Sequence, residues 1–415
     1  MHWFTVLFLV ALALTTLVRL WLSRRQIQHV LHNRQGVPTD FAITITLDQH
    51  QKAADYTVAR TRLAMLDTLV GVAIVCAFTV GGGLQWLIES WSGSFSTEGF
   101  AHGLALIGSV AVITGLVDLP FSLYRTFGIE ARFGFNRMTI GLYIADALKQ
   151  LALAALLGIP LLLVVLWVMA KMGDAWWLWT WLIWMAFNLL MLVLYPTVIA
   201  PLFNKFSPLE DQSLRERIDN LLKRCGFRSQ GVFVMDGSRR SSHGNAYFTG
   251  FGAAKRIVFF DTLIRRLGPT EIEAVLAHEL GHFKLRHILK RIVWLFGASL
   301  VFLALLGFLI KQPWFFNGLG VTTPTTAAAL LLFFMVLPVF TFLLSPLGSL
   351  YSRRHEYEAD AYAASQSSAD DLVRALVKLY QDNAATLTPD PIHSAFYDSH
   401  PPAARRIARL QALTR

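Results

Sequence analysis

The sequence predicts a mainly α-helical protein that crosses a membrane several times and carries a small α+β zinc-hydrolase part. The chain of 415 residues is 54% hydrophobic and only 15% charged, and its mean hydropathy of +0.48 lies beyond the usual range of soluble proteins. Seven apolar stretches are long enough to cross a bilayer. Residues 278–282 read HELGH, which matches the HExxH pattern of zinc hydrolases.

The predicted spans account for about two fifths of the chain. They cover residues 3–22, 64–88, 102–124, 147–170, 176–200, 291–310 and 326–350. Each is close to the ~20 residues that cross a hydrocarbon core. The first span has no basic segment before it and no small-residue cleavage site, and Arg24 and Arg25 follow it. We therefore interpret it as a retained helix and not as a signal peptide.

Basic residues alternate from loop to loop. The segments 23–63 and 125–146 are rich in Lys and Arg, whereas 89–101, 171–175 and 311–325 carry at most one each. The positive-inside rule then places the N-terminus outside and the C-terminus in the cytoplasm. The chain divides into spans one to five (1–200), a cytoplasmic part (201–290), spans six and seven (291–350) and a cytoplasmic C-terminal part (351–415).

The first cytoplasmic part has the pattern of a small α+β unit. Residues 209–227 form an amphipathic helical pattern, and 231–236, 245–251 and 256–261 have the pattern of strands. The strand at 245–251 is a candidate for an edge that binds substrate backbone, and a buried core strand is an equally good interpretation. In the first case the substrate-binding residues are Asn245, Ala246, Tyr247 and Phe248.

The HExxH residues lie on a predicted helix. Pro269 is followed by acidic residues and then by apolar residues at helical spacing, which marks a helix start upstream of the motif. Two histidines four residues apart, His278 and His282, share one face of such a helix and can bind one zinc ion. Glu279 is then placed to act on a metal-bound water.

A third ligand is expected from a second helical segment. Glu356 offers a His₂Glu set that leaves one coordination position open, and Asp360 lies on the same face, where it can accept the outer ring N–H of a ligand histidine. Glu358 is expected to point elsewhere, and His287 to be an ordinary polar residue of its helix. Taken alone, the segment would be a charged and solvated helix face.

Two residues near the C-terminus are weaker candidates. His400 precedes a pair of prolines that would open a helix, and Arg406 lies on that helix. Either side chain could hold the oxyanion of a tetrahedral intermediate if it lies near the metal. A basic surface helix near the membrane is the alternative interpretation.

Several function classes are disfavoured. The net charge of +10 reflects basic membrane loops, and no stretch interleaves aromatic and basic residues as a nucleic-acid groove would. The two cysteines, Cys76 and Cys225, provide no disulfide framework. A seven-helix receptor or transporter would need functional polar residues at the bilayer midplane, where the spans have few. A catalytically idle scaffold would not need an intact HExxH.

Together these motifs resemble the Ste24 family of CAAX prenyl proteases, which are integral-membrane zinc metalloproteases of peptidase family M48. Residues 278–285 (HELGHFKL) are similar to the family run HELGHWKL, residues 353–361 to R-x-x-E-x-x-A-D, and residues 399–402 to SHPP. Residues 245–251 and 255–263 are similar to NAYFxGF and KRIVxxDTL. The resemblance extends in order over nearly the whole chain.

The resemblance implies seven long helices that form an α-barrel around a water-filled chamber, closed at the cytoplasmic end by the zinc domain. It implies one Zn²⁺ per chain, with His278, His282 and Glu356 as ligands and Glu279 as general base. It also places His400 and Arg406 near the scissile carbonyl, and Asn245 on the substrate-binding strand.

The expected substrate is a peptide or protein, which in eukaryotic members carries a prenylated CaaX tail. The short linker 311–325 favours a bacterial-type member. Such a member would lie in the bacterial inner membrane, in contact with lipid. We also expect a monomer. For such a member, quality control of membrane proteins is the alternative role, as in HtpX-like proteases.

Overall fold

The structure is a computed structural model that describes residues 2–227, 229, 231–249 and 256–413. Its described part has seven helices that are long and apolar enough to cross a membrane. They are Trp3–His32, Leu47–Phe78, Phe100–Glu130, Ile140–Lys171, Gly173–Phe203, His287–Leu309 and Thr326–Gln366. Six of the seven predicted spans lie inside these helices, apart from one residue at the end of the sixth span, so the prediction of a polytopic helical protein is confirmed.

The predicted span 64–88 is wrong at its end. Helix α2 (Leu47–Phe78) ends at Phe78, and a separate helix α3 (Gly83–Ser92) begins after a turn. Gly82 in that turn has a left-handed φ of +74°, which glycine adopts without a steric penalty. Apolar composition continues through the turn, so hydropathy alone did not reveal the break.

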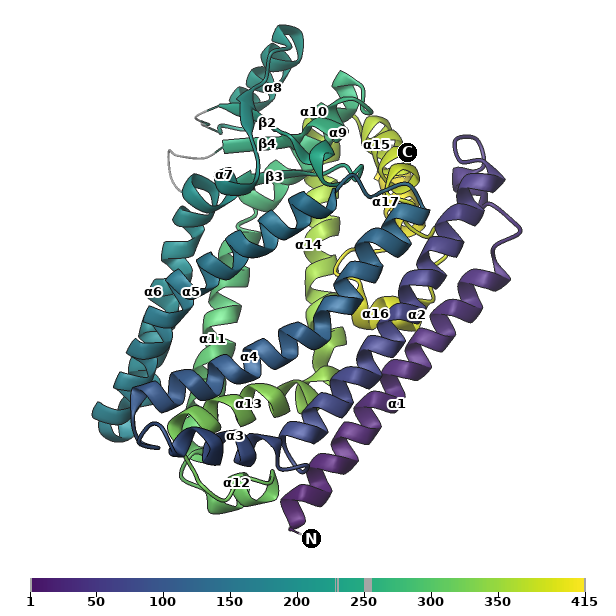
Figure 1. Ribbon diagram of the computed structural model, residues 1–415. Coiled ribbons are helices and arrows are strands. Elements are labelled where there is room, and N and C mark those ends of the chain that lie inside the picture. Colours follow the sequence, from purple (N-terminus) through teal and green to yellow (C-terminus); the bar gives the residue numbers. More distant parts are fainter. Residues whose placement is uncertain (1, 228, 230, 250–255, 414–415) are drawn as a thin grey trace.

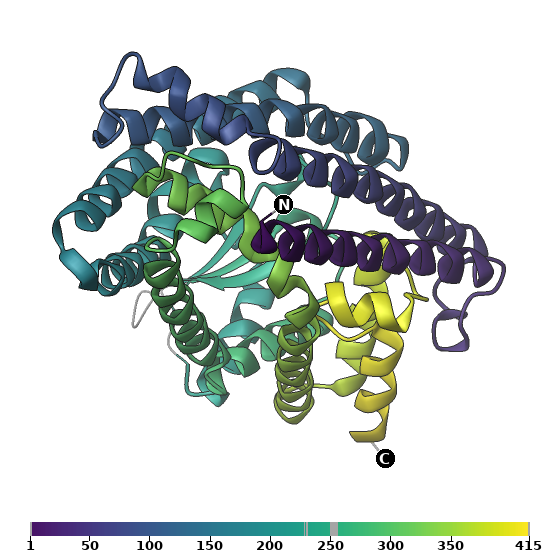
Figure 2. The same ribbon diagram turned by 90° about the horizontal axis from the view of Figure 1, so that it is seen from below.

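The long helices are arranged side by side around a common axis, as the view from below shows (Figure 2). They are α1 (Trp3–His32), α2, α4 (Phe100–Leu123), α5 (Ile140–Lys171), α6 (Trp176–Leu194), α11 (His287–Leu309) and α13 (Thr326–Thr341). A turn with π-helical bonding (Tyr124–Glu130) extends α4, and α7 (Ala200–Phe203) follows α6. Their shared core lies toward the end that α3 and α12 (Pro313–Gly318) cover (Figure 1).

The part that holds the sheet and the HExxH helix, here called the protease part for the resemblance noted above, lies at the opposite end of the helices (Figure 1). Its sheet has the order β1-β2-β4-β3, with β1 (Phe206–Pro208), β2 (Val232–Met235), β3 (Ala246–Thr249) and β4 (Arg256–Phe260). Strands β2 and β4 are parallel, and the outer pairs are antiparallel. Three strands match the sequence prediction, but β1 was missed because it has only three residues and ends in Pro208.

Seven helices of the described chain complete this end of the molecule, some beside the sheet and others packed on neighbouring helices. They are α8 (Gln212–Arg224), α9 (Asp261–Ile264), α10 (Pro269–Lys284), α14 (Ser345–Gln366), α15 (Ala369–Asp382), α16 (Pro391–Tyr397) and α17 (Ala403–Leu413). Phe41 and Ile45, from the segment between α1 and α2, pack against Val377 of α15 and Ile407 of α17. The C-terminal part is thus joined to the first loop of the chain.

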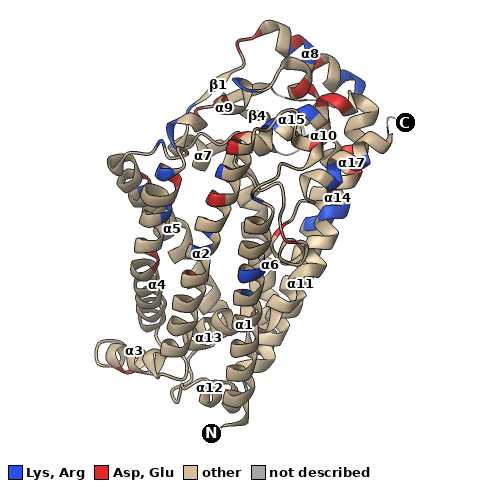
Figure 3. Cartoon of the chain, turned by 90° about the vertical axis from the view of Figure 1, so that its right-hand side faces the viewer, with Lys and Arg blue, Asp and Glu red and all other residues tan. Residues whose placement is uncertain are grey.

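Charged residues gather at this end of the molecule. Lys, Arg, Asp and Glu are concentrated around the sheet and its helices, whereas the middle of the long helices is almost free of them (Figure 3). The two segments with the candidate zinc ligands therefore lie at one and the same end, next to the basic loops.

Candidate active site

Helix α10 carries the HExxH residues and is fixed at its start. Pro269 occupies the first helical position, where its missing N–H costs nothing. The backbone N–H of Gly268 donates to the Glu271 carboxylate at 2.7 Å, and Lys378 of α15 donates to the same carboxylate at 2.8 Å. The helix is buried along most of its length, so the orientation of its histidines is set by packing.

Helix α14 approaches α10 very closely. A Cβ on Gly281 would lie 3.0 Å from the Cα of Ala359 and 3.1 Å from its carbonyl oxygen. Any larger residue than glycine would push the two helices apart. This contact explains why a glycine is needed at position 281, inside the HExxH sequence. It also brings Glu356 of α14 close to the two histidines of α10.

The three predicted ligands form a compact triangle. His278 Nε2 and His282 Nε2 are 3.2 Å apart. Glu356 lies 3.5 Å from His278 Nε2 through Oε2, and 3.3 Å from His282 Nε2 through Oε1. Zinc bonds of about 2.0–2.1 Å to tetrahedral ligands keep the ligand atoms roughly 3.3 Å apart. The buried Oε2 of Glu356 also has no hydrogen-bond partner among the described residues. The donor set therefore fits a zinc ion.

The outer nitrogen of His278 faces a carboxylate, as the sequence suggested. His278 Nδ1 lies 2.8 Å from Asp360 Oδ1. Burial disfavours the charged imidazole, but the nearby carboxylates of Asp360 and Glu356 outweigh it and raise the pKa of His278 to about 9. A carboxylate behind a ligand histidine fixes its tautomer and orientation.

His282 is supported through a second histidine, which corrects the expectation for His287. His287 is only 4% exposed, and its Nδ1 lies 3.0 Å from His282 Nδ1. Its Nε2 lies 3.0 Å from Glu358, which also accepts from Arg354 at 2.9 Å. Glu358 therefore points toward the site and not away from it.

The local backbone explains why this support was missed. Periodicity arguments assumed one continuous helix after the motif, but α10 ends at Lys284 and α11 begins at His287. Between them, Arg286 adopts a left-handed φ of +57°. This turn brings His287 back beside His282, five residues earlier. The residue types at Leu285 and Arg286 do not indicate that the helix ends there, so no sign of this break is visible in the sequence.

His287, His355 and Glu358 form a second group of possible metal ligands. However, the rings of His287 and His355 are stacked at 4.1 Å with an interplanar angle of 11°. Imidazole lone pairs lie in the ring plane, so two parallel rings cannot direct them at one ion at ~2.1 Å. This group is better suited to support His282 than to hold a second metal.

Glu279 and His400 lie next to the ligand triangle. Glu279 is partly buried, and burial raises its pKa above that of a free carboxyl. His400 Nε2 lies 3.4 Å from Glu356 Oε1, while the side chain remains 62% exposed. His400 can therefore meet both the metal ligands and a substrate that enters from solvent.

Arg406 is buried behind the ligands. Its guanidinium makes two hydrogen bonds to Asp360, at 2.8 and 2.6 Å, and its Nη1 lies 3.6 Å from Glu356 Oε2. Asp360 raises the pKa of Arg406 further despite the burial. Arg406 was expected near the scissile carbonyl, and the structure places it against the ligand residues, with Nε and Nη2 on Asp360 and Nη1 facing Glu356.

Strand β3 lies at the edge of the described sheet. It pairs only with β4, with Ala246 opposite Phe259 and Phe248 opposite Ile257. Figure 1 shows β3 as the strand nearest the membrane helices. Asn245 directly precedes the strand, and its side-chain oxygen accepts from the N–H of Ala246 at 2.8 Å. The predicted residues 250 and 251 lie outside the described residues.

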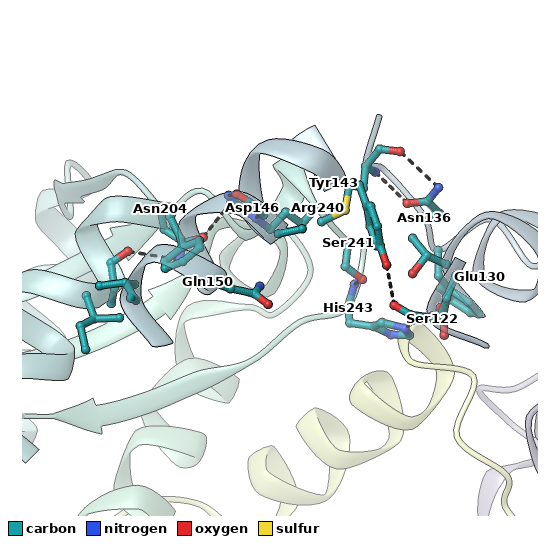
Figure 4. A pocket seen from close by; sticks show the side chains of 18 of the residues that line it. Ser122, Glu130, Asn136, Tyr143, Asp146, Gln150, Asn204, Arg240, Ser241 and His243 are labelled. Carbon is teal, nitrogen blue, oxygen red and sulfur yellow. Dashed lines mark hydrogen bonds and ion pairs between the residues drawn. The ribbon is translucent and has the colours of Figure 1, made fainter. Parts of the chain in front are cut away.

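A pocket of about 770 Å³, lined by apolar side chains and by several charged and polar ones, lies where the membrane helices meet the loop that leads into β3 (Figure 4). Arg240 donates to Asp146 of α5 at 2.8 and 3.0 Å and to Asn204 at 3.1 Å. His243 lies 3.5 Å from Glu130, at the end of the π-helical turn that extends α4. Among the described residues that line this pocket, none belongs to the predicted site. Its ion pairs join the protease part to the helices.

Comparison with known proteins agrees with this architecture. Residues 26–205 match the CAAX prenyl protease N-terminal family of five membrane helices, and residues 208–414 match peptidase family M48. A CAAX prenyl protease 1 homolog of Arabidopsis thaliana is 35% identical, with 89% of each chain covered. CAAX prenyl protease 1 of Saccharomyces cerevisiae is 37% identical, over 75% of this chain and 72% of the yeast protein.

A solved structure is similar over the full length. The crystal structure of S. mikatae Ste24p superimposes with a TM-score of 0.91 at 31% identity, and 99% of each chain is covered. The seven membrane helices, the small sheet and the motif helix of this chain thus have the Ste24p arrangement. The chain belongs to the CAAX prenyl protease family of integral-membrane M48 metallopeptidases.

Proposed function

We propose that this protein is an endopeptidase that holds one zinc ion through His278, His282 and Glu356. The observation that supports this proposal most directly is the ligand triangle, whose sides of 3.2–3.5 Å match a tetrahedral zinc site. A His₂Glu set leaves one position open for catalysis. When bound, zinc polarises the attacking water and the scissile carbonyl.

The residues of the chain then have separate roles. A carboxylate oxygen of Glu279 takes a proton from the attacking water and delivers it to the leaving amine nitrogen. His400 Nε2 donates to the carbonyl oxygen as negative charge develops on it. Asp360 and Arg406 hold His278 in place. The free edge of β3, from Asn245 to Phe248, pairs with the substrate backbone.

The relatives are named CAAX prenyl proteases, so a prenylated CaaX tail is the first candidate substrate. The linker between the last two spans, residues 311–325, is short, which favours a bacterial-type member. We therefore place the protein in the bacterial inner membrane as a monomer, with the protease part in the cytoplasm. Quality control of membrane proteins is the second candidate role.

Two measurements on the detergent-purified protein test the proposal. The first is metal content, where we expect about one zinc per chain in the wild type and none in Glu356→Ala. The second is cleavage of a farnesylated CaaX peptide beside its unprenylated twin. Preference for the prenylated peptide supports CaaX processing, and equal cleavage of both supports quality control. A full zinc equivalent in Glu356→Ala would contradict the ligand assignment.

A further inference from the structure

A basic pocket of about 470 Å³ is lined by residues of α14 and α17. Its lining includes four arginines and one carboxylate, together with Leu350 and Tyr357. The arginines are Arg353 and Arg354 of α14 and Arg405 and Arg409 of α17. The blue segments of α14 and α17 mark Lys and Arg positions on these two helices (Figure 3).

The pocket begins where the lipid-exposed surface of the seventh span ends. Leu344, Leu347 and Leu350 precede it along the chain and are 57%, 64% and 60% exposed. These residues belong to a helical segment that is long and apolar enough to cross a membrane. The change from exposed leucines to arginines places the pocket at the level of the lipid headgroups.

The charges of the pocket are not balanced from within. Its single carboxylate, Glu358, already accepts from Arg354 and His287. Arg353 is buried and donates to the backbone carbonyl of Asp398 at 3.2 Å. Glu358 and Arg353 are therefore engaged in contacts within the protein. The more exposed arginines remain available to bind an anion.

Arg405 and Arg409 are exposed, and no carboxylate of the described residues lies within ion-pair distance of either. The guanidinium of Arg409 lies over the ring of Tyr357 at 4.5 Å, which holds it at the pocket. A guanidinium offers a planar fork of donors that matches the oxygens of a phosphate. Two such groups from α17 face Arg354 of α14.

We propose that this pocket binds the phosphate of an anionic phospholipid headgroup, with the acyl chains along Leu344, Leu347 and Leu350. Basic pockets beside membrane helices are suited to such headgroups. The bound phosphate would connect α14, which carries Glu356 and Asp360, to α17, which carries Arg406. An anionic lipid should therefore stabilise the helix pair that holds the candidate metal ligands.

The test compares Arg405→Gln/Arg409→Gln with a control of equal charge change, Arg215→Gln/Lys223→Gln on α8. The control residues are exposed and lie outside the pocket. Each full-length protein is placed in nanodiscs of phosphatidylcholine with or without phosphatidylglycerol. Phosphatidylglycerol binding is measured by native mass spectrometry, and the thermal unfolding midpoint and zinc content are measured in parallel. None of these readouts depends on proteolysis, so they are separate from the test of the proposed activity.

At about 1 kcal/mol for each arginine near the surface, the pocket variant should bind phosphatidylglycerol about thirtyfold more weakly. It should also lose the rise in unfolding midpoint that the lipid gives the wild type, while the α8 control keeps both. Equal loss in the two variants would overturn the proposal, because it would show only a general charge effect. Inorganic phosphate that competes as well as the lipid at equal concentration would overturn the lipid assignment.

Discussion

The two candidate zinc histidines are both held from behind by carboxylates of α14, one directly and one through another imidazole. Asp360 contacts His278, whereas Glu358 reaches His282 only through His287. The direct contact was predictable, because Asp360 follows Glu356 by one helical turn. The indirect one was not, because it depends on the backbone turn at Arg286. Residue spacing reveals partners on one helix but not across a helix break.

Glu279→Gln should leave the metal site intact and remove the proposed general base. The amide is nearly isosteric with the carboxylate but cannot take a proton from water. We expect kcat/KM for a peptide substrate to fall at least about a hundredfold, the lower range for general-base catalysis. Zinc content measured on the same preparation should stay near that of the wild type. Retained proteolysis by this variant would contradict the role of Glu279.

His287→Phe should weaken zinc binding although His287 is not in the ligand triangle. A phenyl ring keeps the stacking on His355 but cannot accept the Nδ1–H of His282. Loss of such an outer partner costs about 10- to 100-fold in metal affinity. The measurement is a zinc titration against a competing chelator, with His355→Phe as the control, because His355 makes no hydrogen bond to His282. An equal effect of both variants would show that packing alone matters.

At the scale of elements, length and apolar composition predicted the helices well, and short strands were harder. A bilayer of fixed thickness requires an apolar stretch of about 20 residues, and such a stretch can be recognised in the sequence. The three-residue strand β1 exists because it pairs with β2, with Phe206 opposite Met235, and its own residues favour no strand. Whether the segment 245–251 is an edge or a core strand could not be decided from the sequence, since neighbours in a sheet come from distant segments.

If substrate pairs with the edge of β3, removal of a single backbone N–H on that strand should lower kcat/KM. The N–H of Ala246 points away from β4, since it donates to the Asn245 side chain. Ala246→Pro would remove this donor on an edge strand, where proline is tolerated. We expect about a fivefold fall in kcat/KM for peptides, which corresponds to one hydrogen bond of about 1 kcal/mol. Ala246→Ser, which keeps the donor, should be close to wild type. Equal kinetics of the two variants would argue against pairing at this edge.

At the scale of the whole molecule, contacts between distant segments hold the protease part on the membrane helices. Residues around Phe41 pack against α15 and α17, and Arg240 pairs with Asp146 of α5. Sequence analysis predicted that the ligand segments lie at one end but gave no sign of these contacts. They depend on tertiary packing, which the local pattern of residues does not encode.

Asp146→Asn tests the strongest of these connections. The side chains of Asp146 and Arg240 are only 7% and 18% exposed, so loss of one charge leaves the other buried and unpaired. Such a loss costs roughly 3–5 kcal/mol, and the thermal unfolding midpoint should fall clearly. Asp55→Asn is the control, because the Arg34–Asp55 pair is more exposed, at 28% and 44%, and should cost at most about 1 kcal/mol. Similar shifts for both variants would contradict a special role for the buried pair.

The close contact of Gly281 with Ala359 also bears on the order in which the protein is made. The ribosome completes α10 with its two histidines before it makes α11 and α13, and only then α14 with Glu356. The third donor therefore reaches the histidines after the last two membrane helices have been inserted and have turned the chain back. An unfinished or wrongly inserted chain holds an incomplete site. On the proposed ligand assignment, such a chain would lack the third zinc ligand and with it the proposed peptidase activity.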